Sequence, residues 1–203
     1  MGFVTLARPA EHEEVVKGSR FLAVAHPLRH VEQLEASLDR RRSAMGDASH
    51  HAWALRWGDV MRWSDDGEPG GTAGRPVLEV VLKRGLDRAG VIVTRYFGGT
   101  KLGAGGLARA YSGAAARALD AAGVREVEER ERWTVRLPYG AVDAVLRRAH
   151  EQPGAGRAEA DYDALGALVV LELRSADAAS WRRLLADLTR GEAELLERLE
   201  LDT

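Results

Sequence analysis

The chain has 203 residues, of which 45% are hydrophobic and 30% charged, so we expect one large or two small globular domains with a real core. The absence of cysteine excludes disulfides, thiol catalysis and cysteine-ligated metals. The formal net charge of −2 excludes a polycation that gathers nucleic acid by bulk charge, so any anion site must be local.

The chain shows no apolar run near the roughly 18 residues of a membrane span, and its first nine residues lack signal-peptide features. We therefore expect a cytoplasmic protein without a membrane partner.

The first half alternates strand and helix patterns. The predicted elements are a strand over 20–26, a helix over 30–45, strands over 51–57 and 60–63, a helix over 76–84, a strand over 91–94 and a helix over 102–122. Residues 77–82 alone also suit a strand. We favour the helix because Pro76 is well placed in a first helical turn and Gly85 follows the last.

Charged residues crowd into 125–132, which predicts an exposed strand leading to a domain boundary near Arg130. Beyond it the predicted elements are a strand over 133–137, a helix over 140–150, a loop over 153–156, strands over 157–162 and 167–173, a helix over 177–189 and a strand over 192–199. This β-α-β-β-α-β order is the ferredoxin-like plan. The sequence thus predicts an α+β protein with domains 1–130 and 131–203.

Residues 94–113, here called the glycine-rich segment, contain no Asp or Glu and open the helix predicted over 102–122. The segment holds Gly98, Gly99, Gly103, Gly105, Gly106 and Gly113 together with Arg95, Lys101 and Arg109. Glycines allow a ligand to approach the backbone, and a helix N-terminus offers unpaired N–H groups to an anion. The segment matches neither the P-loop nor the dinucleotide fingerprint.

Arg109, Gly113 and Arg117 recur at helical spacing, which puts two cations on one helix face with a gap between them. The pattern predicts a site for a phosphate-rich ligand. The alternative is that the glycines serve only close helix packing, but packing does not explain the missing acids.

A second cluster over 64–76 contains Asp65, Asp66 and Glu68. These acids suit either a Mg²⁺ ion or ion pairs with Arg75 and the cations of the glycine-rich segment. They also suit a turn that caps the helix beginning near Pro76.

Aromatic residues lie among the cations. Tyr96, Phe97 and Tyr111 are candidates to stack bases while lysine and arginine hold phosphates, although a core role for Phe97 is equally open. The adjacent His50 and His51 point to opposite faces of a strand, so they are not expected to ligate one metal.

The runs SDDGEPGGTAGRP (64–76) and VTRYFGGTKLGAGGLARAY (93–111), preceded by SRF (19–21) and HHAWA (50–54), closely resemble the IMPACT family. The second half also resembles bacterial members at Tyr139, Tyr162 and residues 188–191. Ala52 stands where the resemblance leads us to expect a cysteine. The chain begins directly at the shared domain, so the partners of the eukaryotic proteins' extra N-terminal module are not expected.

The resemblance implies an N-terminal α/β sandwich of the kind found in a small-subunit ribosomal protein, in domain IV of elongation factor G and in GHMP kinases. It implies a C-terminal domain similar to the last domain of elongation factor G, and an association with regulation of translation.

Three hypotheses follow. The first is a non-catalytic protein that binds RNA or the ribosome. The second is a Mg²⁺-dependent phosphotransferase or hydrolase, a reading that rests on fold alone. The third is an adaptor that binds another protein. Because no catalytic triad or complete cofactor fingerprint is present, we expect binding without a cofactor rather than catalysis.

Overall fold

The computed structural model describes residues 2–151 and 158–201, and it divides into two compact units. One unit, here called the N-terminal unit, spans Val4–Glu126, and the remaining described residues form the C-terminal unit. The predicted loop over 153–156 and the predicted strand start at residue 157 lie outside the described residues. The predicted α+β class is confirmed.

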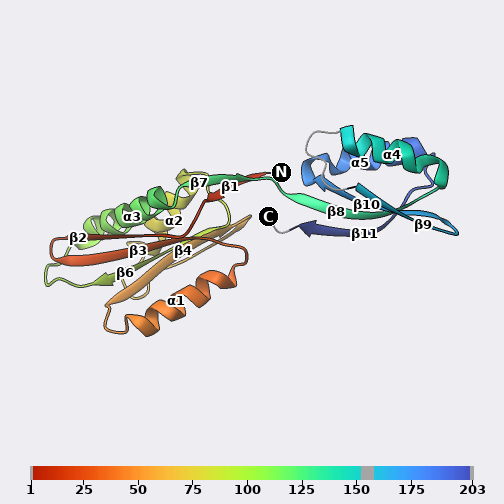
Figure 1. Cartoon of the computed structure of the whole chain (residues 1–203). Coiled ribbons are helices and arrows are strands. Elements are labelled where there is room, and N and C mark those ends of the chain that lie inside the picture. Colours follow the sequence, from red (N-terminus) through yellow and green to blue (C-terminus); the bar gives the residue numbers. More distant parts are fainter. Residues whose placement is uncertain (1, 152–157, 202–203) are drawn as a thin grey trace. The chain divides into compact units, whose positions relative to one another are not determined.

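The N-terminal unit is built from a five-stranded sheet with helices on both faces (Figure 1). Its elements are β1 (Phe3–Leu6), β2 (Ala10–Val16), β3 (Ser19–Pro27), α1 (Glu32–Ala44), β4 (His50–Trp57), β5 (Val60–Ser64), α2 (Gly74–Lys83), β6 (Ala89–Tyr96), α3 (Gly103–Ala122) and β7 (Val124–Val127). The sheet order is β2-β3-β6-β4-β5, with all neighbours antiparallel, and β1 pairs with β7.

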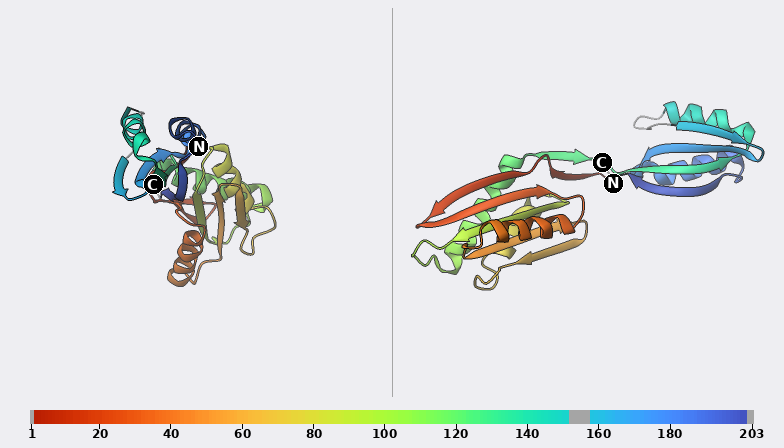
Figure 2. Two further views of the ribbon diagram at one scale, coloured as in Figure 1. Left: turned by 90° about the vertical axis from the view of Figure 1, so that its right-hand side faces the viewer. Right: turned by 60° about the horizontal axis from the view of Figure 1, so that its bottom comes forward.

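The alternation of side chains along β6 divides the core into two layers. Val91 and Val93 face the cluster formed with α2 and α3, whereas Ile92 faces the cluster formed with α1. Accordingly, α1 covers one sheet face while α2 and α3 cover the other (Figures 1 and 2). The alanine-rich α3 can pack closely because its core-facing side chains are small.

The ambiguous segment after Pro76 is a helix, as predicted. Val77, Leu78 and Val81 recur at helical spacing and are buried on one face of α2. Two strands were not predicted, namely β1 and β2. β2 is an edge strand whose residues alternate between half-buried and exposed, and its glutamates obscured the apolar pattern.

The C-terminal unit has the predicted ferredoxin-like order. Its elements are β8 (Arg130–Leu137), α4 (Tyr139–Glu151), β9 (Ala158–Asp163), β10 (Gly166–Arg174), a short 3-10 turn (Ser175–Asp177), α5 (Ala178–Thr189) and β11 (Glu194–Leu201). The strands form one antiparallel sheet in the order β11-β8-β10-β9, and both long helices pack on one face (Figure 2). Buried Trp133 and Trp181 fill the space between sheet and helices.

Of the helices in the described parts of the chain, none combines the length and apolar character needed to span a membrane.

Candidate ligand-binding site at the start of helix α3

The first turn of α3 is open to a ligand. Gly103 begins the helix with a φ of +69°, and the preceding Leu102 makes no side-chain cap. Gly103, Ala104 and Gly105 are exposed, and the first turn contains no acidic residue. Since the first N–H groups of a helix have no intrahelical acceptor, this end of α3 offers donors and a partial positive charge.

A cleft of about 320 Å³, here called the Phe97 cleft, lies against this helix start. It is lined by Glu68, Pro69, Arg95, Phe97, Lys101, Leu102, Gly103, Ala104 and Leu107. The exposed Lys101 and the helix start favour an anion, while the prolyl, phenyl and leucyl side chains supply apolar wall.

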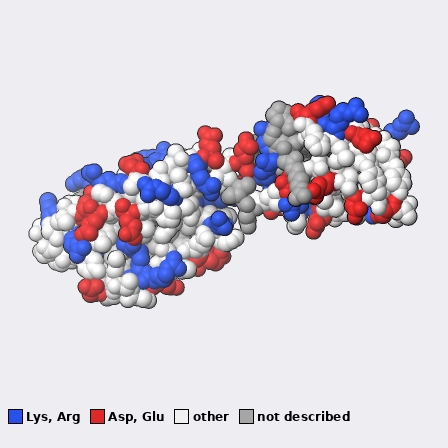
Figure 3. All heavy atoms as spheres, viewed as in Figure 1, with Lys and Arg blue, Asp and Glu red and all other residues white. Residues whose placement is uncertain are grey.

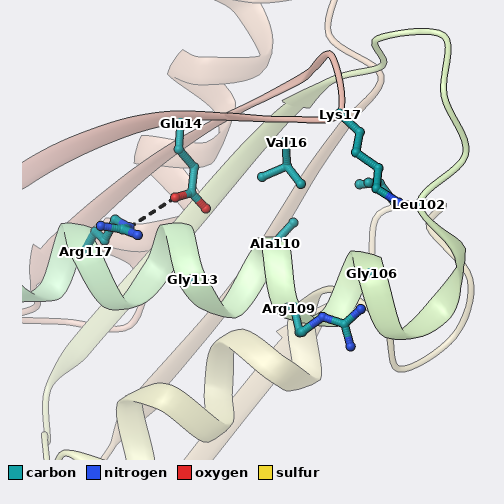
Figure 4. A pocket seen from close by; sticks show the side chains of 9 residues that line it. All are labelled: Glu14, Val16, Lys17, Leu102, Gly106, Arg109, Ala110, Gly113 and Arg117. Atoms are coloured by element: carbon teal, nitrogen blue, oxygen red, sulfur yellow. Dashed lines mark ion pairs between the residues drawn. The ribbon is translucent and has the colours of Figure 1, made fainter.

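A second cleft of about 350 Å³, here called the β2 groove, runs between α3 and the edge strand β2. It is lined by Glu14, Val16, Lys17, Leu102, Gly106, Arg109, Ala110, Gly113 and Arg117. Figure 4 shows Lys17 extending toward Leu102, the residue that lines both clefts. The two clefts therefore flank the same helix start.

The β2 groove contains a carboxylate that the glycine-rich segment itself does not reveal. Glu14 projects from β2 toward Gly113, and its Oε2 lies 3.1 Å from the Nε of Arg117 (Figure 4). Arg109 and Arg117 both line this groove, but Arg117 points toward Glu14 whereas the Arg109 side chain points away from it (Figure 4). However, the charge of Arg117 is paired, whereas none of the ion pairs between described residues involves Lys17, Lys101 or Arg109.

Beneath the Phe97 cleft lies a buried polar cluster centred on Glu68. The Oε1 atom of Glu68 lies 2.6 Å from Nη1 of Arg95 and accepts a 2.8 Å hydrogen bond from the Tyr111 hydroxyl. The side chains of Glu68 and Arg95 are only 3% and 5% exposed. Burial raises the pKa of the Tyr111 hydroxyl, and the Glu68 carboxylate raises that pKa further, so the hydroxyl stays protonated and donates. Glu68 therefore forms an ion pair with a cation of the glycine-rich segment, which is one of the three interpretations that the sequence left open for these acids.

This burial changes the roles available to the predicted aromatic and basic residues. The Tyr111 ring is fully buried and packs edge-to-face on Phe21, so it offers no face to a base. Tyr96 packs against Arg20 and donates to Asp47, away from both clefts. Of the three candidate stacking residues, Phe97 lines a cleft and is 51% exposed.

The glycines of the glycine-rich segment have different structural roles. A Cβ on Gly98 would lie 1.9 Å from the carbonyl carbon of Gly18, so this glycine is required for close backbone packing. Gly99 and Gly103 have positive φ values of +85° and +69°, which favour glycine for conformational reasons. Close packing therefore explains Gly98, although the contact is between two loops and not with a helix, while the exposed Gly105 has room for a side chain.

The three acids of the 64–76 cluster point to different partners. Asp65 accepts backbone hydrogen bonds from Gly71, Ala73 and Gly74, at the start of α2. Asp66 pairs with Arg42 and accepts from the His51 N–H, while Glu68 binds Arg95. Within the described ranges, no three His, Asp or Glu side chains converge as metal ligands.

Arg75 does not join this cluster. It lies exposed on α2, where it pairs with Glu79 one turn later. The two adjacent histidines face opposite sides of β4, as expected: His50 Nε2 is 3.9 Å from Glu68, whereas His51 Nδ1 is 3.0 Å from the Thr94 hydroxyl on the side of α1.

The contacts of Asp65 predict a capping effect on stability. Replacing Asp65 with alanine removes the acceptor of three backbone N–H groups and is expected to destabilise the N-terminal unit by about 1–2 kcal/mol, the upper part of the range for lost helix caps. Asp65→Asn keeps one oxygen, which can still accept from Ala73 and Gly74, but its amide nitrogen cannot accept from Gly71, so it should recover part of the loss in urea denaturation. Equal losses in both variants would contradict capping as the role of Asp65.

Sequence reasoning missed three residues that shape the site. Glu14 and Lys17 come from the unpredicted β2 and its following turn, and the buried Ser19 accepts hydrogen bonds from Gly98 N–H and Arg95 Nη2. The alternation of Ala10, His12, Glu14 and Val16 was the available signal, because it places these residues on one strand face.

Comparisons with known proteins agree over most of the chain. Residues 17–119 match the model of a family described as the Impact N-terminal domain. An IMPACT family member encoded in the pol 5′ region of Thermus thermophilus is 41% identical over 181 residues, covering 87% of this chain and 97% of that protein. The IMPACT family member YigZ of Escherichia coli (strain K12) is 32% identical over 195 residues, covering 94% and 95% of the two chains. A crystal structure described as that of a hypothetical protein has a TM-score of 0.68 and 31% identity, covering 96% of each chain.

Proposed function

Since the chain belongs to the IMPACT family, we propose that it acts in the regulation of translation by binding RNA, free or at the ribosome surface, through the start of α3. The observation that carries the proposal is the open first turn of α3, which lies between two clefts whose cations Lys17, Lys101 and Arg109 have no acidic partner among the described residues. Backbone N–H groups at a helix start and nearby cations are the groups that proteins use to hold phosphates.

The rest of the surface supports a local site rather than a broad basic face. On the face drawn in Figure 3, Lys and Arg side chains are interspersed with Asp and Glu. With a net charge of −2, long-range attraction to RNA is weak, so affinity must come from a few close contacts. The proposed contacts are therefore few enough to be removed by substitution.

A Mg²⁺-dependent phosphotransfer has less support. Asp65, Asp66 and Glu68 are each held in hydrogen bonds or ion pairs with the protein, and they point in different directions. Freeing two of them for one ion would break the cap of α2 or the pair with Arg95. Binding without chemistry is the simpler function for this arrangement.

The proposal predicts a loss of RNA affinity when Lys101 and Arg109 are both changed to alanine. We expect binding at low salt to weaken about tenfold or more, because a hydrogen bond to a charged group contributes about 1.5–3 kcal/mol. The slope of log affinity against log salt should fall by about one for each phosphate that the variant no longer neutralises. Fluorescence anisotropy with labelled RNA at several salt concentrations measures both quantities.

The matched control is Arg40→Ala with Arg62→Ala, because this pair removes the same charge from exposed positions on α1 and β5. It should leave affinity and salt slope close to those of the unaltered protein. If both double variants lose affinity equally, the binding depends on overall charge and the site is not at α3. Unchanged RNA binding by the Lys101 and Arg109 variant, or a partner that persists after nuclease treatment, would favour the protein-adaptor function instead.

A further inference from the structure

Phe97 occupies an unusual position for an apolar side chain. It follows directly after β6, where its backbone N–H donates to the Ser49 hydroxyl, yet its side chain is left 51% exposed in the wall of the Phe97 cleft. The Arg95 guanidinium lies over the ring, 5.4 Å from its centroid. Because Arg95 is itself fixed by Glu68, the ring rests on a rigid support rather than swinging freely in solvent.

The surroundings of the ring suit a flat, partly apolar ligand. Pro69, Leu102 and Leu107 line the same cleft, so a ring laid on Phe97 would also meet apolar side chains. A cation over one face of an aromatic ring is attracted by the electrons of that ring, and aromatic pairs prefer offset stacking on the remaining face. An exposed phenyl ring beside a helix start thus combines the two contacts that a nucleotide needs, one for its base and one for its phosphate.

A buried donor in the same wall remains without an acceptor. Arg95 Nε has no hydrogen-bond partner among the described residues, although the residue is only 4% exposed and lines the cleft. A buried N–H donor without an acceptor lowers the stability of the folded chain. Because Arg95 lines the cleft, a ligand acceptor that reaches this N–H would remove that loss of stability.

We infer that the site takes single-stranded RNA, with one unpaired base stacked on Phe97 and the adjoining phosphate held by the α3 start and Lys101. This inference rests on the proposed function and names its ligand class. A cleft of about 320 Å³ has the size of a small-ligand site, which admits one nucleotide but no duplex. Because Leu102 borders both clefts, the strand continues past it into the β2 groove toward Arg109.

The test compares a single strand of about 10 nucleotides, a length within known site sizes, with a duplex of the same length. The single strand carries the fluorescent base 2-aminopurine, whose emission changes when its stacking partners change. Phe97→Ala should weaken single-strand binding between roughly fivefold and a hundredfold and abolish the change in emission on binding, while duplex binding stays unchanged. Phe97→Tyr should restore both signals because it restores a ring.

Two controls separate stacking from damage to the fold. Phe97→Leu keeps an apolar cover over Arg95 but removes the ring, so it should bind as weakly as the alanine variant while remaining as stable as the unaltered chain. Trp63→Ala removes a similarly exposed aromatic residue, 48% exposed on β5, and should have no effect on binding.

The outcomes distinguish the inference from the proposed function. If Lys101→Ala with Arg109→Ala weakens binding but Phe97→Ala and Phe97→Leu do not, the phosphate site stands and base stacking is overturned. Preference for the duplex over the single strand would also overturn the inference. If neither RNA binds the unaltered protein at low salt, both the proposed function and the inference fail.

Discussion

Replacing Glu68 with alanine is expected to destabilise the N-terminal unit by about 3–5 kcal/mol, the cost of removing one partner from a buried ion pair. The Arg95 guanidinium, held 2.6 Å from the Glu68 carboxylate, would be left buried without its counter-charge. The Tyr111 hydroxyl would lose its acceptor in the same step. Urea denaturation measures the loss, and hydrogen exchange of the β6 amides assigns it to this unit.

The cause can be separated from simple loss of volume. Glu68→Gln keeps the side-chain shape and an acceptor for the Tyr111 hydroxyl but removes the negative charge beside Arg95. The free energy of unfolding of this variant should therefore still be clearly lower than that of the unaltered chain. Adding Arg95→Met to Glu68→Ala removes the orphaned cation, and the double variant should be more stable than Glu68→Ala alone, a coupling that a double-mutant cycle measures. A loss below about 1 kcal/mol for Glu68→Ala would mean that solvent reaches Arg95 and that the pair contributes as little as an exposed one.

Most of the fold could be predicted because local patterns and tertiary packing agree. The apolar spacing in α2 and α3 and the alternation in β10 specify both the element and its buried face, whereas β3 and β4 are apolar on both faces because helices cover both sides of their sheet. The prediction failed for β2, because this edge strand has one face covered by α3 while glutamates occupy much of the rest. Backbone pairing with β3, the next strand across the turn at Lys17 and Gly18, holds such a segment in place, and this pairing does not require an apolar pattern in β2.

The two clefts lie where the sequence predicted a ligand site, but the ion pairs and hydrogen bonds among their lining residues were not predictable. The density of glycines and the absence of acids over 94–113 pointed to the start of α3, and the two clefts lie there. That Arg95 and Tyr111 are buried around Glu68, however, depends on the strand face of Arg95, on the helix face of Tyr111 and on contacts across 27 and 43 residues of chain. The same holds for Glu14, which enters the groove from a strand that the sequence did not reveal.

Gly98→Ala is the second substitution with a large expected effect, and it separates structural glycines from those that serve a ligand. The added Cβ would lie 1.9 Å from the carbonyl carbon of Gly18 and 2.3 Å from the amide nitrogen of Ser19. Both are backbone atoms, so the turn between β2 and β3 must move away. We expect a loss of about 3 kcal/mol or more, at or beyond the upper end for overpacking, measured by urea denaturation.

Gly105→Ala provides the contrast within the same segment. Its Cβ would lie 3.6 Å from the nearest atom outside its own helix neighbours, the Nη1 of Arg109, which is an ordinary contact. Alanine in a helix is favoured over glycine by about 0.5–1 kcal/mol, so this variant should be as stable as the unaltered chain or more so. If its RNA affinity nevertheless falls, the missing side chain at Gly105 serves close approach of the phosphate to the α3 start. If affinity and stability both hold, the open backbone there is not used, and phosphate contacts come from Lys101 and Arg109 alone.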